Sequence, residues 1–356
     1  MNEKSNSKNE KTVFRRLMDQ FGLPRLIITL FLIMLLIMAP IVGADFPTQI
    51  SNIIARFSWN SVLVLAMVPM VHSGCGLNFG LPLGIISGLL GATLSIEFGF
   101  TGGFSFVMAV LIATPFALVL GCLYGWLLNK IKGGEMMIAT YVGFSSVSLM
   151  CMMWLILPYK SPNMVWGLAG KGLRTTISLE GYYDQVLASF LEIRIGNLVV
   201  PTGTLLFFAF LAFLMWAFLH TKTGTAMTAV GSNPNFARAA GINIDRTRML
   251  SVVMSTWLAA VGILMYEQGF GFIQLYMAPF NMALPAVSAI LIGGASVNKA
   301  SVTNVIIGTI LFQGIVTMTP TVMNSMIHMD ISEVLRIIVS NGMILYALTR
   351  KTEATR

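Results

Sequence analysis

The stretch FSFVMAVLIATPFALVLGCLYGWLL, residues 104–128, is 25 residues long and contains no charged side chain. It exceeds the roughly 20 apolar residues that an α-helix needs to cross the hydrocarbon core of a bilayer. The rest of the chain has the same character, because 56% of its 356 residues are hydrophobic and only 10% are charged. Soluble domains carry about a quarter charged residues. The sequence therefore predicts a protein embedded in a membrane.

Similar apolar runs recur along the whole chain and predict about ten spans. They cover residues 26–42, 57–71, 81–96, 104–128, 136–157, 204–219, 250–266, 284–297, 302–319 and 337–348. The expected fold class is an all-α polytopic membrane protein with about ten transmembrane helices. Its transmembrane domain covers residues 26–349, with a long outer loop at 158–201 and a cytoplasmic loop at 222–248, and a cytoplasmic tail follows at 350–356.

The N-terminal segment, residues 1–25, has two interpretations. Its basic residues, the apolar run that follows and the small residues 42–44 resemble a cleavable signal peptide. Residues 12–21, however, place their apolar side chains on one face of a helix and two arginines off that face. This pattern favours a retained amphipathic helix on the cytoplasmic surface of the membrane.

The distribution of basic residues gives the orientation. With the N-terminus inside and ten spans, sixteen of the 22 Lys and Arg residues fall on the inner side. Such a bias is what the positive-inside rule predicts, and it places both termini in the cytoplasm. Since this rule accounts for the net charge of +8, nucleic acid is not needed as a partner to explain it.

No catalytic or metal site is expected. Cys75, Cys122 and Cys151 lie in or beside apolar spans, without the paired spacing of a metal site or a disulfide framework. The three histidines lie on three separate elements, and a hydrogen-bonded or interfacial role is favoured for each over catalysis or metal binding. The chain also lacks a nucleotide-binding motif, so no bound cofactor is predicted.

A short helix is predicted within the cytoplasmic loop, at residues 233–241. Asn233 has the side chain that an N-cap requires, Pro234 suits the first helical position, and Gly241 can adopt the left-handed conformation that ends a helix. About seven residues do not form a stable helix alone in water. We therefore expect packing to hold this helix, with a partner protein as the support.

Two glycine-rich breaks interrupt the pattern of spans. Gly74–Gly80 follows the second span, and Gly269–Gly271, with Pro279 and Asn281, follows the seventh. The two spans run in opposite directions, so paired breaks indicate an inverted repeat with a substrate path at the repeat interface. Ordinary loops and close helix packing explain the glycines equally well. Asn78, the polar residue of the first break, is either a group of that path or a cap of the next helix.

The outer loop, residues 158–201, contains a helical apolar pattern. The apolar residues are Tyr183, Val186, Leu187, Phe190 and Leu191. They predict an amphipathic helix with charged residues on its other face. Such a helix lies on the outer leaflet or offers its polar face to a solute-binding protein, and the lipid-facing role is favoured.

Four stretches of the chain resemble one family of transporters. They are GCLYGWLLNKIKGGEMMIAT at 121–140, TGTAMTAVGSNP at 223–234, AAGI at 239–242 and AILIGGAS at 289–296. They resemble ribose-type sugar permeases of binding-protein-dependent ABC importers, whose relatives include branched-chain amino acid permeases. The similarity runs from about residue 60 to 349, and the cytoplasmic loop is its most specific part.

This resemblance implies a transport subunit, not an enzyme, in a cytoplasmic membrane of bacterial type. It implies three protein partners: an ABC ATPase that uses ATP and docks under residues 222–248, a second permease subunit, and an extracytoplasmic solute-binding protein. Membrane lipid surrounds the spans. The candidate residues for contact with the ATPase are Gly231, Asn233, Pro234, Arg238, Ala240 and Gly241. The candidate residues for the substrate pathway are Cys75, Asn78, Phe79 and Thr140. Arg238, Arg246 and Arg248 can pair with acidic groups of the ATPase, and positive-inside anchoring explains them about as well.

The identity of the solute does not follow from the resemblance. Where sugar permeases commonly carry a Gly-Gly-Ile-Asp-Leu-Ser run, this chain has Ser-Gly-Cys-Gly-Leu-Asn at 73–78 and lacks the aspartate. A monosaccharide is the favoured solute, and nucleosides, branched-chain amino acids and an autoinducer sugar are alternatives.

An ion-coupled secondary transporter is the main rival class. Such a carrier keeps ionisable groups deep within its spans, whereas Glu97 and Glu267 are expected at span ends. A membrane enzyme is less favoured still, because no cluster of His, Asp, Glu or Cys recurs at one level.

Overall fold

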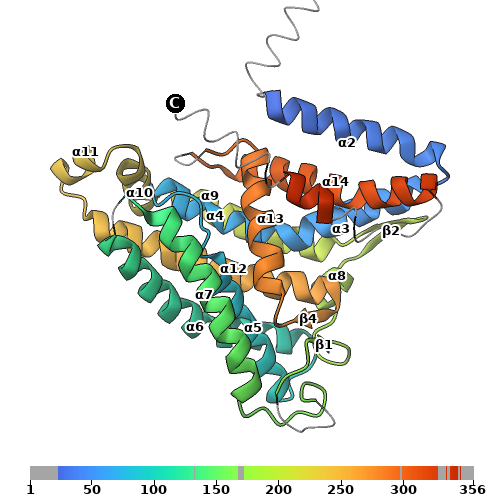
Figure 1. The fold of residues 1–356 in the computed structure, drawn as a ribbon, viewed down its shortest axis with the longest axis horizontal. Coiled ribbons are helices and arrows are strands. Elements are labelled where there is room, and N and C mark those ends of the chain that lie inside the picture. Colours follow the sequence, from blue (N-terminus) through green and yellow to red (C-terminus); the bar gives the residue numbers. More distant parts are fainter. Residues whose placement is uncertain are drawn as a thin grey trace, which may run out of the picture.

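The computed structural model describes residues 23–131, 133–166, 172–296, 299–327, 334, 337–343 and 345. This part of the chain is mostly helical (Figure 1). Its helices are α2 (Leu23–Ile41), α3 (Phe46–Leu65), α4 (Met67–His72), α5 (Leu81–Glu97), α6 (Gly102–Lys130), α7 (Glu135–Ile156), α8 (Val186–Ser189), α9 (Thr202–Leu219), α10 (Lys222–Ser232), α11 (Pro234–Ala239), α12 (Ile244–Phe270), α13 (Ala278–Ile292) and α14 (Val302–Ile327). The four short strands are β1 (Thr176–Ser178), β2 (Ile193–Ile195), β3 (Leu198–Val200) and β4 (Phe272–Gln274).

Six helical segments of the described chain are long and apolar enough to cross a membrane. They are Phe46–His72, Gly102–Lys130, Glu135–Ile156, Thr202–Leu219, Ile244–Phe270 and Val302–Ser325. Three shorter apolar helices, Arg25–Ile41, Leu81–Glu97 and Ala278–Ile292, accompany them. A polytopic all-α membrane protein is therefore confirmed. The predicted helix at 12–21 lies outside the described residues, and the tenth apolar run, 337–348, lies partly outside them.

Helices α5 and α12 form the centre of the molecule, and glycines bring them together. A Cβ atom added at Gly84 would lie 2.4 Å from the carbonyl oxygen of Thr256 in α12, and one at Gly88 would lie 2.6 Å from that of Ala260. On the side toward α6, a Cβ atom at Gly91 would lie 2.4 Å from the carbonyl oxygen of Ala109. Because such contacts leave no room for a methyl group, the glycines of α5 determine how closely these helices pack.

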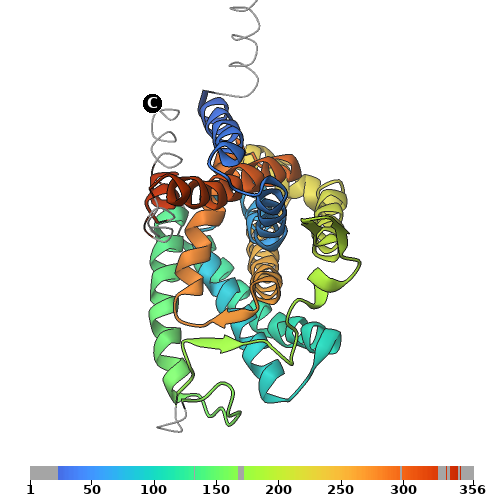
Figure 2. The ribbon, with the colours of Figure 1, turned by 90° about the vertical axis from the view of Figure 1, so that its right-hand side faces the viewer.

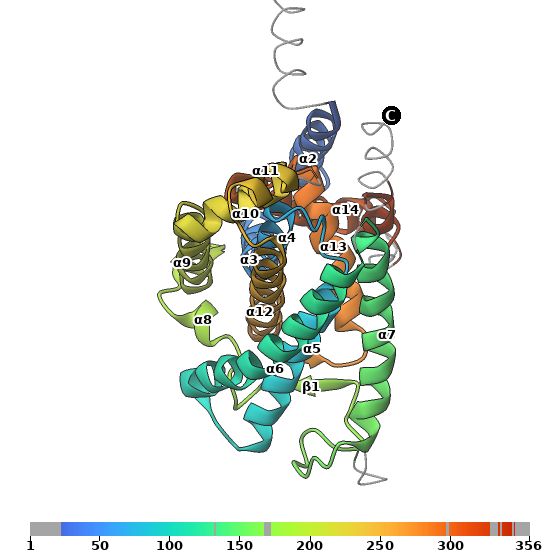
Figure 3. The same ribbon diagram turned by 90° about the vertical axis from the view of Figure 1, so that its left-hand side faces the viewer.

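The contacts between helices follow one pattern twice within the described part of the chain. Helix α12 packs against α6, and α5 also packs against α6. In the same way, α3 packs against α14, and α13 also packs against α14. Exchanging α3 with α12, α5 with α13 and α6 with α14 preserves these neighbours. Helix α7 lies on one flank of the central helices and α9 on the other (Figures 2 and 3). Their surfaces, like that of α6, are mostly exposed, so these three helices provide apolar area for lipid or for another subunit.

The predicted amphipathic helix of the outer loop is wrong. Only α8, four residues long, forms there, and positive φ angles at Gln185 (48°) and Leu191 (55°) interrupt the helix at both ends. The backbone N–H of Gln185 donates to the carbonyl oxygen of Gln268 (2.8 Å), and that of Leu187 donates to its side-chain Oε1 (3.1 Å). These bonds attach the segment to the end of α12, and residues 193–200 form the β2–β3 hairpin instead. Tertiary hydrogen bonds therefore outweigh the helical pattern.

Two further contacts hold the same end of the molecule. Strand β1 pairs with β4, which directly follows α12, and Ile177 lies opposite Ile273 with both side chains fully buried. The carboxylate of Glu97, at the end of α5, accepts the backbone N–H groups of Lys160 (2.9 Å) and Ser161 (3.0 Å). The 158–201 loop is thereby fastened to both central helices.

Replacing Gly88 with Ala should destabilise the fold, although Ala is the better helix former. The added methyl group would lie 2.2 Å from Cγ2 of Ile263 and 2.6 Å from the Ala260 carbonyl oxygen, and overpacking of this kind costs about 1–3 kcal/mol. Thermal unfolding of the purified chain in detergent measures the effect. Gly103→Ala is the matched control, because its methyl group would meet only Val186 at an ordinary 3.5 Å. Equal melting temperatures for the two variants would contradict this account of the α5–α12 contact.

Candidate functional site

The short helix predicted at 233–241 is present as α11. The Asn233 side chain accepts the backbone N–H of Phe236 at 3.1 Å, and Pro234 occupies the first helical position. Gly241 has a φ of 77° and follows the C-cap residue Ala240, and the backbone N–H of Ile242 returns to the carbonyl oxygen of Ala237 at 2.9 Å. The start and end signals of the sequence are therefore confirmed.

The inner face of α11 is held by the chain itself. Ala237 is fully buried in a small apolar cluster with Val230 of α10 and Ile244 of α12, and Ile242 packs beside them. This cluster provides part of the support that the sequence assigns to a partner. On the outer face, Phe236 is 65% exposed and Arg238 is exposed, so a large apolar ring and a cation remain available for a partner.

Helix α10 packs directly on the first glycine-rich break. A Cβ atom added at Gly231 would lie 2.2 Å from the carbonyl oxygen of His72 and 2.9 Å from the backbone nitrogen of Gly74. A Cβ atom at Gly74, which has a φ of 73°, would in turn lie 2.9 Å from the Cα of Gly231. Two backbones thus touch where only glycine fits. Two predicted candidates on distant parts of the sequence, Gly231 and the break, are brought together.

His72 strengthens this junction, and the sequence analysis missed its position. Its Nε2 lies 2.7 Å from the carbonyl oxygen of Ala300, to which it donates, and its Nδ1 lies 3.2 Å from Oγ1 of Thr228 in α10. The side chain therefore connects the end of α4 with α10 and with the segment before α14. The sequence signal for this position was a histidine two residues before a glycine-rich break. The expectation that this histidine is hydrogen-bonded is confirmed.

Asn78 is fully buried, and both polar atoms of its side-chain amide form hydrogen bonds. Its Nδ2 donates to Oγ of Ser255 in α12 (2.7 Å), and its Oδ1 accepts the hydroxyl of Tyr124 in α6 (3.2 Å). Ser255 donates onward to the carbonyl oxygen of Ala66 (2.5 Å). Asn78 does not cap α5, whose N-cap is Gly80 without a side-chain bond. In this conformation the amide connects the break to two central helices, and its role in a pathway stays a prediction.

The other pathway candidates lie around the same break. Cys75 is buried against Tyr124 and Ala139, and Phe79 is half-buried beside this cluster. Helix α7 passes close by, because a Cβ atom at Gly143 would lie 2.6 Å from the Phe79 carbonyl oxygen. Thr140 is half-buried on α7, and its hydroxyl donates to the carbonyl oxygen of Met136 at 2.9 Å. Their contact with a solute also stays a prediction.

One arginine expected to be available to a partner is already paired. Arg248 Nη1 lies 3.1 Å from Oε1 of Glu135, and the two side chains are only 11% and 15% exposed. This ion pair joins the starts of α12 and α7. Arg238 and Arg246 are exposed. The part of the chain that the structure describes contains no group of three potential metal ligands.

At the opposite end of α12, Glu267 lies deeper than expected. The helix continues to Phe270, so Glu267 is inside it and only 1% exposed. It meets Tyr183 of the outer loop, also fully buried, and burial together with this carboxyl group raises the pKa of the Tyr183 phenol well above its usual range.

A protein-family model matches most of the chain. Residues 49–348 match the family described as the branched-chain amino acid transport system / permease component. No solved structure matches the chain.

Relatives of known function transport different solutes. The nucleoside ABC transporter permease NupB of Lactococcus lactis is 29% identical over 199 residues, which is 52% of each protein. The xylose transport permease XylH of Haemophilus influenzae is 24% identical over 343 residues, 84% of this chain and 88% of XylH. The autoinducer 2 import permease LsrC of an Enterobacter species is 24% identical over 271 residues, 75% of this chain and 70% of LsrC. The match to NupB thus spans only about half of that protein.

Replacing Asn78 with Leu should destabilise the fold by about 1–2 kcal/mol, because the Tyr124 and Ser255 hydroxyls lose a buried partner. Tyr124→Phe removes only the longer of the two bonds and should cost less. Thermal unfolding in detergent gives both values, and Asn235→Leu on the exposed face of α11 is the control. If Asn78→Leu unfolds at the wild-type temperature, the amide is not a structural connection at this break.

Proposed function

Because this chain belongs to the permease family of binding-protein-dependent ABC importers, we propose that it forms the membrane pathway for a monosaccharide, driven by ATP hydrolysis in a separate subunit. The chain is a multi-pass protein of the cytoplasmic membrane. The observation that carries the proposal is the direct contact of α10, which leads into α11, with the first break through Gly231, His72 and Gly74.

The docking surface for the ATPase is the outer face of α11. Phe236 and Arg238 are exposed there, and a large ring beside a guanidinium is the kind of anchor that dominates protein interfaces. Its inner face packs on Val230 and Ile244, so a push on α11 moves α10 and the start of α12 together. The family resemblance also assigns Gly231, Asn233, Pro234, Ala240 and Gly241 to contact with the ATPase, and these residues shape the α10–α11 segment.

The movement reaches the pathway through close backbone contacts. Gly231 touches His72 and Gly74 without intervening side chains, so α10 cannot shift without displacing the break. The break is connected by Asn78 to α6 and α12. Opening of this connection would expose the Asn78 amide and the neighbouring Cys75, Phe79 and Thr140 to a solute. Alternating access thus corresponds to two packings of the break against α6, α7 and α12.

A monosaccharide is the favoured solute because the similarity to the xylose permease extends over 84% of the chain. A nucleoside is the second candidate, favoured by the higher identity, 29%, to the nucleoside permease over about half of the chain. Both solutes are uncharged and rich in hydroxyl groups, so a few amide and hydroxyl groups on apolar walls suit either one. Branched-chain amino acids, which carry two charges, are less suited to such walls.

Two further protein partners complete the importer. A second permease subunit, identical or related, would enclose the path, and the apolar surfaces of α6, α7 and α9 offer area for it or for lipid. A solute-binding protein would dock on the 158–201 loop, which is fastened to both central helices.

Purification of the complex from its native membrane, followed by identification of the subunits that co-elute, tests the proposal. An ABC ATPase and a solute-binding protein are the expected companions. In proteoliposomes, the binding protein loaded with xylose or with a nucleoside should stimulate ATP hydrolysis, and the better stimulant identifies the solute class. Uptake that follows an ion gradient without ATP would instead support a secondary transporter.

Gly241→Val should uncouple ATP hydrolysis from the solute. A β-branched residue at a φ of 77° is strained, although no atom lies within 4 Å of the added Cβ, so the loss comes from backbone conformation and not from a clash. Solute-stimulated ATPase activity of the reconstituted complex should fall at least fivefold. Gly241→Asn is the matched control, because Asn tolerates the left-handed conformation, and it should keep most of the activity. Equal activity of both variants would show that this conformation is not required.

Phe236→Ala should weaken retention of the ATPase subunit during purification, because it removes the largest exposed apolar group of α11. Stability of the isolated permease should not change, since the ring is 65% exposed. Phe98→Ala, at a ring 63% exposed at the end of α5, is the control for loss of an exposed aromatic side chain. Retention at the wild-type level would place the docking surface elsewhere.

A further inference from the structure

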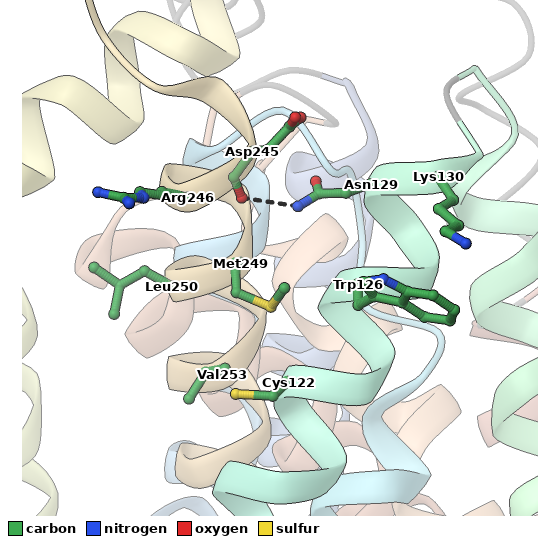
Figure 4. Close-up of a pocket in the computed structure, with 9 residues that line it drawn as sticks. All are labelled: Cys122, Trp126, Asn129, Lys130, Asp245, Arg246, Met249, Leu250 and Val253. Atoms are coloured by element: carbon green, nitrogen blue, oxygen red, sulfur yellow. Dashed lines mark hydrogen bonds between the residues drawn. The ribbon is translucent and has the colours of Figure 1, made fainter.

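A groove lies between the end of α6 and the start of α12, and none of the contacts above uses it (Figure 4). Its volume is about 610 Å³, within the roughly 300–1,000 Å³ typical of small-molecule sites. Along one wall it extends from Lys130, the last residue of α6, to Cys122. Eight residues of helix correspond to about 12 Å. The groove therefore descends from the water-facing end of a membrane-spanning helix into its apolar part.

The two ends of the groove differ in chemistry. Cys122, Met249 and Val253 line the deeper part, without charged groups. Lys130 and Arg246 border the shallow part on opposite sides, and their charged groups point away from each other (Figure 4). Its one acid, Asp245, directs its carboxylate away from the apolar part, while its backbone carbonyl accepts the Asn129 amide at 2.8 Å. The Lys130 cation beside an apolar channel matches a ligand with an anionic head and a hydrocarbon tail.

Trp126 places this boundary at the surface of the membrane. The ring is 52% exposed, and Nζ of Lys130 lies 4.1 Å from its centroid. Tryptophan concentrates where hydrocarbon meets the headgroup region, and lysine extends its charge toward the headgroups. The cation held over the ring stays near the membrane surface, where a lipid phosphate lies.

We propose that this groove binds an anionic glycerophospholipid, with its phosphate beside Lys130 and the start of one acyl chain along Cys122, Met249 and Val253. The proposal goes beyond the transport function and needs only that this end of the molecule meets a lipid–water interface. Because α12 begins at Ile244, directly after α11, a bound lipid contacts the same helix end that the ATPase would move.

Native mass spectrometry of the purified complex in detergent tests the proposal, with phosphatidylglycerol and phosphatidylcholine of equal chain length as probes. The wild type should retain phosphatidylglycerol in preference. Lys130→Ala should weaken that retention about fivefold, the effect expected from one basic residue near an anionic membrane surface. Lys160→Ala, which removes an exposed lysine at the opposite end of the molecule, should not change it. Cys122→Trp should abolish retention by filling the deeper part of the groove.

Three outcomes would overturn the proposal. The first is equal retention of the two lipids by the wild type, and the second is unchanged phosphatidylglycerol retention in both Lys130→Ala and Cys122→Trp. The third is efficient cross-linking of Cys122 between two permease copies in the complex, because a second subunit would then occupy the groove. The ATPase content of each sample is measured in parallel. Loss of the ATPase with lipid retention intact would count against the proposed function and leave the lipid site supported.

Discussion

A helix that is interrupted within a membrane frees backbone groups, and hydrocarbon offers those groups no hydrogen-bond partners. The protein must therefore cover each interruption with its own atoms. At the first break, α10 provides the cover through Gly231, and Asn78 ties the break to α6 and α12. At the second, which follows α12, strand β4 pairs with β1 of the outer loop, and the carbonyl oxygen of Gly271 accepts the backbone N–H of Leu179 at 3.0 Å. Much of the remaining architecture serves these two junctions.

This requirement explains why the proposed coupling segment lies where it does. A segment that covers a break is already in contact with the part of the membrane domain whose packing changes with the smallest cost in free energy. Glycine at both Gly74 and Gly231 removes the side chains that would otherwise absorb a displacement. The contact thus has both the proximity and the stiffness that transmission of a movement requires.

Several elements of this arrangement follow from sequence, and others do not. The long apolar helices and α11 were predictable because uncharged runs, an Asn-Pro start and a Gly end are local signals. The expected count of ten spans stays a prediction, since the described residues contain six helices long enough to cross a membrane and three shorter apolar ones. The helix expected at 183–191 is not formed, because Gln268, more than 70 residues away, accepts the backbone N–H groups of Gln185 and Leu187. The pairing of Arg248 with Glu135 and the partners of Asn78 depend equally on contacts between distant segments. Local sequence patterns do not record contacts between distant segments. The position of each glycine-rich break was therefore predictable, and the segment that packs on it was not.

Helix α12 connects the two junctions to each other. Its 27 residues correspond to about 40 Å of uninterrupted helix, long enough to cross the bilayer. At one end Ile244 packs against Ala237 of α11, and at the other Gln268 holds the outer loop (Figure 1). Between them Ser255 holds Asn78, and the glycines of α5 press against Thr256 and Ala260. Any shift of α11 along this axis therefore reaches the first break and the outer loop through one rigid element. A single helix in contact with both α11 and the 158–201 loop gives a physical basis for reciprocal coupling, in which events at these two ends influence each other.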